Sequence, residues 1–414
     1  MNKNVLSRLR YWPCLAYVVF LVGCDQYDPP RFHANMVAMN QQQIPEKPQQ
    51  QDIANILDAM FGTPDEPFVL ADTGLDIKKL EQAAGPVRSD QFGRETGLYR
   101  RHCGHCHGTT GDGLGPTALV LNPYPRDYRQ GKFKFKSTDR PDKPTDYDLE
   151  VIVRQGVAGT AMPSFNLLPD PQIKALVEYV KYLSLRGETE IRLINAMADL
   201  SEGTLDISRT ALIDEILAPV AETWKTAKEK IIVPPDKPDV ELAKSVEQGR
   251  ELFYGTKANC VKCHGPSALG DGQTNDYDDW NKPLMEIAKS VASERESLRT
   301  NPELTPEQRS EIEARVATTT AILHSDSLPV RTITPRNLRL GVYRGGRAPY
   351  DLYRRFYAGI NGVPMPGVGP TVPGGEGTLS PDEIWALVDY VQSLPYEAIS
   401  EPPRQRPTVS QARY

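Results

Sequence analysis

The sequence of 414 residues is poor in cysteine and, after residue 23, lacks any long hydrophobic run. No later stretch approaches the roughly 20 apolar residues of a membrane-spanning helix. A basic stripe is also missing, and the net charge is −6, which argues against nucleic acid as a partner. Hydrophobic residues make up 39% of the chain, so we expect two or three folded domains.

The N-terminus is predicted to be an export signal, residues 1–23. A short basic stretch precedes 13 mostly apolar residues, Tyr11 to Gly23, which are too few to cross a bilayer but suit a signal peptide. The string Leu21-Val22-Gly23-Cys24 resembles the lipobox of bacterial lipoproteins, where the cysteine is acylated after cleavage. We expect Cys24 to anchor an exported protein to the periplasmic face of a bacterial membrane. An ordinary secretion signal with a chance cysteine is the alternative.

The remaining cysteines form two short motifs. Cys14 lies in the signal and Cys24 is the lipid site, which leaves the pairs Cys103/Cys106 and Cys260/Cys263. An exported protein that keeps no further cysteines for disulfides has another use for these four.

Each pair is followed by a histidine, His107 or His264, and Cys-x-x-Cys-His is the attachment signature of c-type haem. Residues i and i+3 share one face of a helical turn, so both thiols can reach one porphyrin. A zinc site built from both pairs and redox-active thiols are the rival interpretations. Zinc would not require the histidines, and the pairs stand 157 residues apart.

The motifs belong to an internal repeat, with copies at about 89–186 and 244–395. Five blocks recur in the same order, which indicates a duplicated domain. The paired blocks are Gly93-Arg94-Glu95 with Gly249-Arg250-Glu251, the two Cys-x-x-Cys-His motifs, Pro125-Arg126-Asp127 with Pro335-Arg336-Asn337, Gly159-Thr160-Ala161-Met162-Pro163 with Gly362-Val363-Pro364-Met365-Pro366, and the apolar helices starting near Ile173 and Ile384.

Over about 240 residues the two copies resemble class I cytochrome c domains. The resemblance implies an all-α fold and two covalently attached haem c groups. It also implies His107 and His264 as proximal iron ligands, and Met162 and Met365, in loops just before the terminal helices, as distal ligands. A loop methionine that only fills a gap in the core is the alternative. The second copy has eight more residues between its methionine and its helix.

The domain organisation is predicted as follows. The ranges are 1–23 signal peptide, 24–88 lipid-anchored tether, 89–186 first domain, 187–243 interdomain helical linker, 244–396 second domain with an insertion at about 283–329, and 397–414 C-terminal tail.

Three segments outside the repeat carry further expectations. Asp25 to Gln51 is rich in Gln, Pro and Asn, which favours an extended, solvated linker, with a short helix at Ile53 to Phe61. Residues 212–224 have the apolar spacing of an amphipathic helix. The insertion reads as a charged helical hairpin with a capping box at Thr305, either a solvated excursion or a partner-docking lid.

Other polar residues near the motifs are weighed against haem ligation. His102 and His105 are predicted to be exposed or bonded to backbone, and His324 in the insertion is a minor competitor of Met365. The two Gly-Asp-Gly strings, at 111–113 and 270–272, are predicted tight turns. Arg126 and Arg336 could pair with haem propionates, but exposure is the commoner case for arginine.

These features predict an electron carrier and no catalytic residues. Two methionine-ligated irons leave no open coordination site, which disfavours the alternative, a di-haem peroxidase or dehydrogenase subunit with one open haem. Expected partners are redox proteins, such as a membrane oxidoreductase or terminal oxidase, together with the membrane itself through the lipid.

Overall fold

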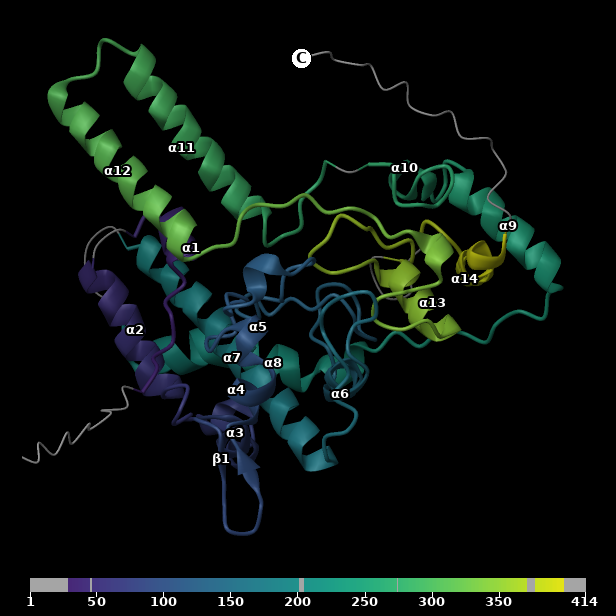
Figure 1. The fold of residues 1–414 in the computed structure, drawn as a ribbon, viewed down its shortest axis with the longest axis horizontal. Helices are drawn as coiled ribbons and strands as arrows, with labels where there is room; N and C mark the ends of the chain where they lie inside the picture. The colour runs from purple at the N-terminus through teal and green to yellow at the C-terminus, as the bar shows by residue number, and fades with distance from the viewer. Residues whose placement is uncertain (1–28, 45–46, 201–204, 274, 371–376, 398–414) are drawn as a thin grey trace, which may run out of the picture.

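The computed structural model describes residues 29–44, 47–200, 205–273, 275–370 and 377–397. The predicted signal peptide, Cys24 and nearly all of the predicted C-terminal tail lie outside the described residues. Within them the chain is mostly helical, as predicted (Figure 1). The helices are α1 Met36–Gln41, α2 Lys47–Phe61, α3 Ile77–Ala83, α4 Leu98–His102, α5 Gly104–His107, α6 Asp146–Gln155, α7 Asp170–Ala198, α8 Ala218–Lys225, α9 Leu242–Tyr254, α10 Val261–His264, α11 Lys282–Thr300, α12 Pro306–Ser325, α13 Pro349–Ala358 and α14 Pro381–Ser393.

Short elements complete the described fold. They are the strands β1 Arg88–Ser89 and β2 Glu95–Thr96, the π-helix η3 Thr210–Leu217, and the 3-10 helices η1 Ala71–Thr73, η2 Ala118–Val120, η4 Ala227–Lys230, η5 Leu338–Leu340 and η6 Leu394–Tyr396. Within the described ranges, none of the helices combines the length and apolar character that crossing a membrane requires.

Buried side chains form two hydrophobic cores, one for each copy of the repeat. The first joins α2, α3 and α7 and extends from Phe32 to Ala221. The second is built on α9, α13 and α14 and extends from Phe253 to Leu394. In the second core α9 crosses α14 at Gly249, where an added Cβ would lie 2.0 Å from the carbonyl oxygen of Ala386. Only glycine permits so close an approach between the helices.

The first pair of blocks in the predicted repeat, those that begin at Gly93 and Gly249, does not occupy equivalent positions in the structure. Gly249 lies inside α9, whereas Gly93 has φ +71° in the turn between β1 and β2, with open space around it. In the first copy α3 packs against α7 in place of such a helix. The three-residue match therefore joins two different local structures, and the first folded unit begins well before residue 89.

The predicted tether is also wrong for the described residues from 29 to 88. Met39 on α1 and Ile53, Leu57 and Phe61 on α2 are buried in the first core, so this segment is part of the folded unit. The helix expected at Ile53 to Phe61 is confirmed as the second half of α2. The polar composition was misleading because a short helix needs only one or two apolar side chains to pack against the other helices of the unit.

The predicted linker at 187–243 needs a similar correction. The terminal helix α7 continues unbroken through the expected boundary at residue 186 and ends at Ala198. The amphipathic segment is confirmed as η3 and α8, and its Leu217 and Val220 are buried in the first core. Most of the linker is therefore part of the first unit.

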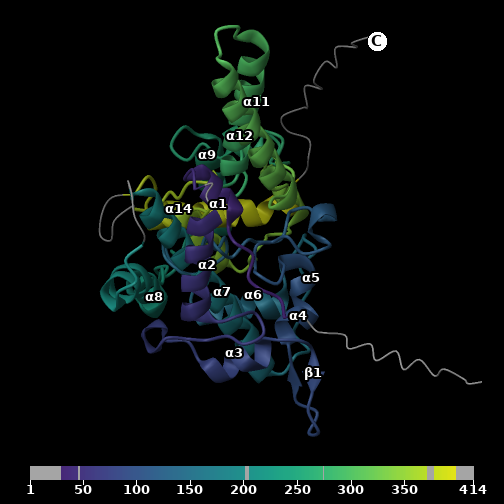
Figure 2. The same cartoon turned by 90° about the vertical axis from the view of Figure 1, so that its left-hand side faces the viewer.

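The insertion is a helical hairpin, as predicted. It consists of α11 and α12, and Thr305 forms the expected capping box with Gln308. Both views show the hairpin projecting from the body, with its base beside α1 (Figures 1 and 2). There Thr319 Oγ1 lies 3.0 Å from Asn40 Oδ1, so the hairpin contacts the N-terminal segment of the first unit.

Candidate functional site

Each Cys-x-x-Cys-His motif forms one short helical turn. The amide of His107 donates to the carbonyl oxygen of Cys103, and the amide of His264 donates to that of Cys260, both at 2.9 Å. This turn places the two cysteines of each motif on the same side of the helix. All four cysteines are unpaired and partly buried.

The first cysteine of each motif does not have the character of a redox-active or zinc-binding thiolate. Burial raises the pKa of Cys103 to about 12 and that of Cys260 to about 11, whereas reactive thiols have lowered pKa values. Among the described residues, no three His, Cys, Asp or Glu side chains gather closely enough to bind a metal ion. Neutral thiols beside one histidine fit thioether attachment of a porphyrin better than either rival.

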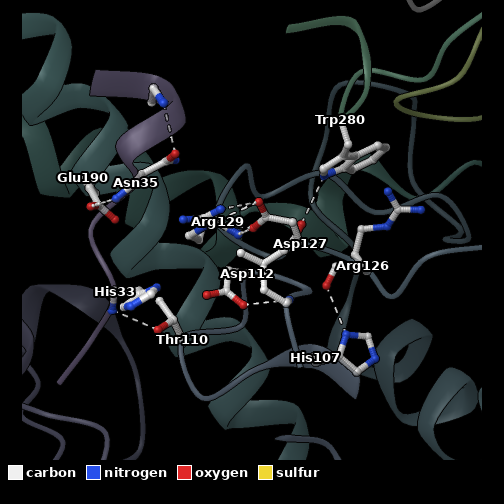
Figure 3. Close-up of polar contacts among 12 residues, drawn as sticks. His33, Asn35, His107, Thr110, Asp112, Arg126, Asp127, Arg129, Glu190 and Trp280 are labelled. Atoms are coloured by element: carbon white, nitrogen blue, oxygen red, sulfur yellow. Dashed lines mark hydrogen bonds and ion pairs between the residues drawn. The ribbon is translucent and has the colours of Figure 1, made fainter. Parts of the chain in front are cut away.

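The two motif histidines have the same hydrogen-bond partner in the repeat. Nδ1 of His107 lies 3.0 Å from the carbonyl oxygen of Arg126 (Figure 3). Nδ1 of His264 lies 3.2 Å from the carbonyl oxygen of Arg336. A carbonyl only accepts, so Nδ1 carries the proton and Nε2 keeps its lone pair for a metal. Burial lowers the pKa of His107 to about 4 and lowers that of His264, so both rings are neutral at pH 7.

The Gly-Asp-Gly strings are tight turns, as predicted, that fix the chain after each motif. The amides of Gly113 and Gly270 donate to the carbonyls of His107 and His264, each at 2.9 Å. Gly111 and Gly270 have φ of +75° and +81°, a conformation that glycine adopts at no steric cost.

The methionine loops also fold alike. The helices α6 and α13 end at Gly156 and Gly359, with φ of +68° and +73°, where the chain turns back on itself. The next amide then donates to the methionine carbonyl, Val157 to Met162 and Ile360 to Met365, both at 3.2 Å. A second pair of bonds, from Phe165 to Val153 and from Val368 to Phe356, repeats the same register.

His264 and Met365 line one large cavity of about 1850 Å³, together with Cys260 and Cys263. Its apolar walls come from the second core, and they include Phe253, Phe356, Leu352, Leu387 and Val391. The predicted ligands of the second motif are therefore brought together around a hollow lined by apolar side chains.

The cavity is also lined by arginines that need an anionic partner. The Nε atoms of Arg336 and Arg344 are buried without a hydrogen-bond acceptor. Burial lowers the pKa of Arg126 and of Arg355 to about 10. A haem group would place an apolar ring against the apolar wall and two carboxylates within reach of these arginines, so the residues fit it. The expectation that Arg126 and Arg336 are exposed is wrong, because both side chains turn inward.

The other histidines lie away from the cavity lining. His105 and His324 are exposed, and His102 packs edge-on against Phe165, with ring centroids 5.8 Å apart. None of the three lines the cavity that contains His264 and Met365.

Sequence reasoning missed Trp280 and Arg140. Trp280 stands where the insertion begins and donates its indole N–H to the carbonyl oxygen of Asp127, 3.2 Å away. Its ring lies under the guanidinium of Arg126 at 3.5 Å, as Figure 3 shows. Arg140, in the first unit, donates to the methionine loop of the second at Val363 O. The rarity of tryptophan, four in the chain, was a signal for Trp280, but no sequence pattern marked Arg140.

Comparison with known proteins identifies part of the chain. Residues 92–180 match the family model described as cytochrome c oxidase, cbb3-type, subunit III. Among curated proteins, none is significantly similar to this sequence. A solved structure, titled as the reducing HAO-like protein complex of Kuenenia stuttgartiensis, is similar at 22% identity and a TM-score of 0.44, covering 74% of this chain and 97% of its own. Residues 92–180 are therefore similar to a c-type cytochrome domain, and this family implies covalently bound haem c.

Proposed function

We propose that this protein is a di-haem c-type cytochrome that transfers electrons between redox partners outside the cytoplasmic membrane, to which Cys24 anchors it by lipid. The observation that carries the proposal is the duplicated histidine geometry. In both copies a neutral imidazole, buried at His107 and half-buried at His264, follows a Cys-x-x-Cys turn. Its Nδ1 donates to the carbonyl of the arginine in the Pro-Arg-acid/amide block.

Each iron would be held by a histidine and a methionine, His107 with Met162 and His264 with Met365. Haem supplies the one-electron chemistry, while the chain sets its potential and its access to solvent. The thiols of Cys103, Cys106, Cys260 and Cys263 would form the thioether bonds.

The test is a haem count together with a ligand-binding spectrum. The intact mass of the mature protein should exceed that of the polypeptide by two haem groups after acid–acetone extraction. Ferric protein should show the weak far-red band of methionine-ligated haem, and the ferrous protein should not bind carbon monoxide rapidly. A single haem would refute the proposal.

A second candidate function is a di-haem redox enzyme with one open haem site. Its open site would lie in the cavity around His264, whose volume of about 1850 Å³ has to hold the haem as well as a substrate. Rapid uptake of carbon monoxide at one haem would support the enzyme over the carrier.

A further inference from the structure

The two repeats meet in an interface that is held by polar contacts as well as by packing. Lys132 Nζ lies 2.7 Å from Asp279 Oδ2, and Lys134 Nζ lies 3.2 Å from Asp278 Oδ2. Arg331 Nη1 donates to the carbonyl of Leu121 at 2.7 Å. The Lys134–Asp278 pair is largely buried, with side chains 17% and 12% exposed, so the relative position of the units is well defined.

Across this interface, Arg140 of the first repeat reaches the methionine loop of the second. Its Nη2 donates to the carbonyl oxygen of Val363 at 2.8 Å, and its Nη1 lies 3.5 Å from that of Met365. These carbonyls flank Pro364 in the Gly-Val-Pro-Met-Pro segment. Hydrogen bonds from a guanidinium are stronger than those from a neutral donor.

The segment that carries Arg140 is itself fixed. The amide of Asp139 donates to the carbonyl of Lys230, and Lys136 Nζ donates to the carbonyls of Asp139 and Asp142. Thr138 Oγ1 bonds the carbonyl of Lys143 at 2.8 Å. The backbone segment that carries Arg140 is therefore held by hydrogen bonds on both sides, which a positioning residue requires.

A corresponding contact runs from the second repeat to the methionine loop of the first. Arg344 of the second repeat donates from Nη2 to the carbonyl of Gly159 at 3.4 Å, in the methionine loop of the first. A Cβ added at Gly159 would lie 2.8 Å from Arg336 Nη2. Arg336 and Arg344 therefore both lie against that loop. Two loops of the same sequence type thus meet arginines of the opposite repeat.

We propose that each repeat positions the axial methionine loop of the other, with Arg140 as the positioning residue for Met365 and Arg344 as that for Met162. The proposal rests on the haem function proposed above. Neither arginine is itself an iron ligand. Each acts by holding loop carbonyls, which fixes the direction in which the methionine side chain leaves the backbone.

The test uses the full-length haem-loaded protein and three variants. Arg140→Gln should weaken the far-red band of the second haem and open that haem to carbon monoxide. Arg344→Gln should do the same at the first haem, with a smaller change at the second haem because Nε of Arg344 also lines the cavity around His264. Arg94→Gln is the control, because Arg94 is 74% exposed in the β1–β2 turn and far from either loop in the sequence. Substitutions Met162→His and Met365→His assign each spectral component to its haem.

Hydrogen exchange gives a readout that does not depend on iron ligation. In Arg140→Gln, the loop from Gly359 to Gly367 should exchange roughly tenfold faster, while the loop from Gly156 to Pro163 should not change. In Arg344→Gln the pattern should be reversed. A variant that accelerates its own repeat's loop, or neither loop, would overturn the proposal. If the wild-type protein lacked methionine ligation, the haem assignment would fail, and the exchange data would still decide whether the arginines hold the loops.

Discussion

At the scale of single residues, Arg126 combines two roles in two places. Its carbonyl oxygen accepts a hydrogen bond from Nδ1 of His107 in the first unit. Its guanidinium stacks on Trp280 and lines the cavity that contains His264. The only acids near this guanidinium that raise its pKa are Asp278 and Asp127, which are engaged by Lys134 and Arg129. A positive charge from the first repeat therefore lines the proposed haem site of the second.

This charge should raise the reduction potential of the second haem, because ferric haem carries one more positive charge than ferrous haem. We expect Arg126→Gln to lower that potential by roughly 40–90 mV, the equivalent of ~1–2 kcal/mol between charges at an effective dielectric constant near 20. Optical redox titration measures the shift, and Met365→His identifies the wave that belongs to the second haem.

The backbone carbonyl at position 126 is kept in this variant, so ligation by His107 should be unaffected. Arg94→Gln again provides a solvent-exposed control with no expected change. An unchanged second potential in Arg126→Gln would mean that the guanidinium does not face the haem.

Residue patterns predicted the parts of the site that repeat in sequence. The motif turns, the Gly-Asp-Gly turns and the methionine loops depend on local geometry that specific residue types impose. The same residue types therefore recur in both copies, and the sequence shows the match. Trp280 and Arg140 act through contacts with residues more than 150 positions away in sequence, 153 for Trp280 with Asp127 and 223 for Arg140 with Val363. Such contacts leave no local period, which is why sequence alone did not reveal them.

At the scale of elements, the described N-terminal segment is held to α7 by a buried polar cluster. Glu190 Oε1 accepts from the amide of Asn35 at 2.7 Å, and Glu190 Oε2 pairs with Arg186 Nη1 at 3.3 Å. The side chains of Glu190 and Arg186 are 1% and 4% exposed. Phe32 completes the cluster with its ring 4.2 Å from the guanidinium of Arg186.

Removing the carboxylate should therefore release this segment. We expect Glu190→Ala to lower the free energy of unfolding by ~3–5 kcal/mol, because Arg186 would remain buried without its counter-ion. Chemical denaturation measures the loss, and limited proteolysis should show new cleavage between residues 29 and 44.

Glu247→Ala is the matched control. Glu247 pairs with Arg250 at 3.7 Å on the surface of α9, with side chains 62% and 44% exposed, so its loss should cost less than ~1 kcal/mol. Equal effects of the two substitutions would argue that the cluster does not hold the segment.

Sequence patterns also predicted most helices but not where the first unit begins. The capping box of α12 at Thr305 and the apolar spacing of α14 around Ile384 are local signals, and both helices lie where expected. The segment of α1 and the start of α2 carries few apolar residues and many glutamines, so its helices depend on tertiary contacts with α7 and the hairpin. Those contacts could not be read from composition.

At the scale of the whole molecule, the proposed lipid at Cys24 leads to a localisation test. We expect Cys24→Ser to release the protein from membranes of an expressing bacterium into the soluble fraction, because the substitution removes the proposed site of acylation. Fractionation followed by haem staining measures the distribution. A variant that stays in the membrane fraction after a high-salt wash would place the anchor elsewhere.

The folded N-terminal segment changes what such an anchor can do. A 64-residue flexible tether would let the haem domains wander by about 45 Å from the membrane. Instead, Phe32, eight residues after Cys24, is already buried in the first core, and eight residues span at most ~29 Å. A lipid-anchored protein of this build cannot swing between partners at different heights. It would stay close to the bilayer surface at a nearly constant height and meet its partners by lateral diffusion. The docking faces of those partners must therefore lie at the same short distance from the membrane.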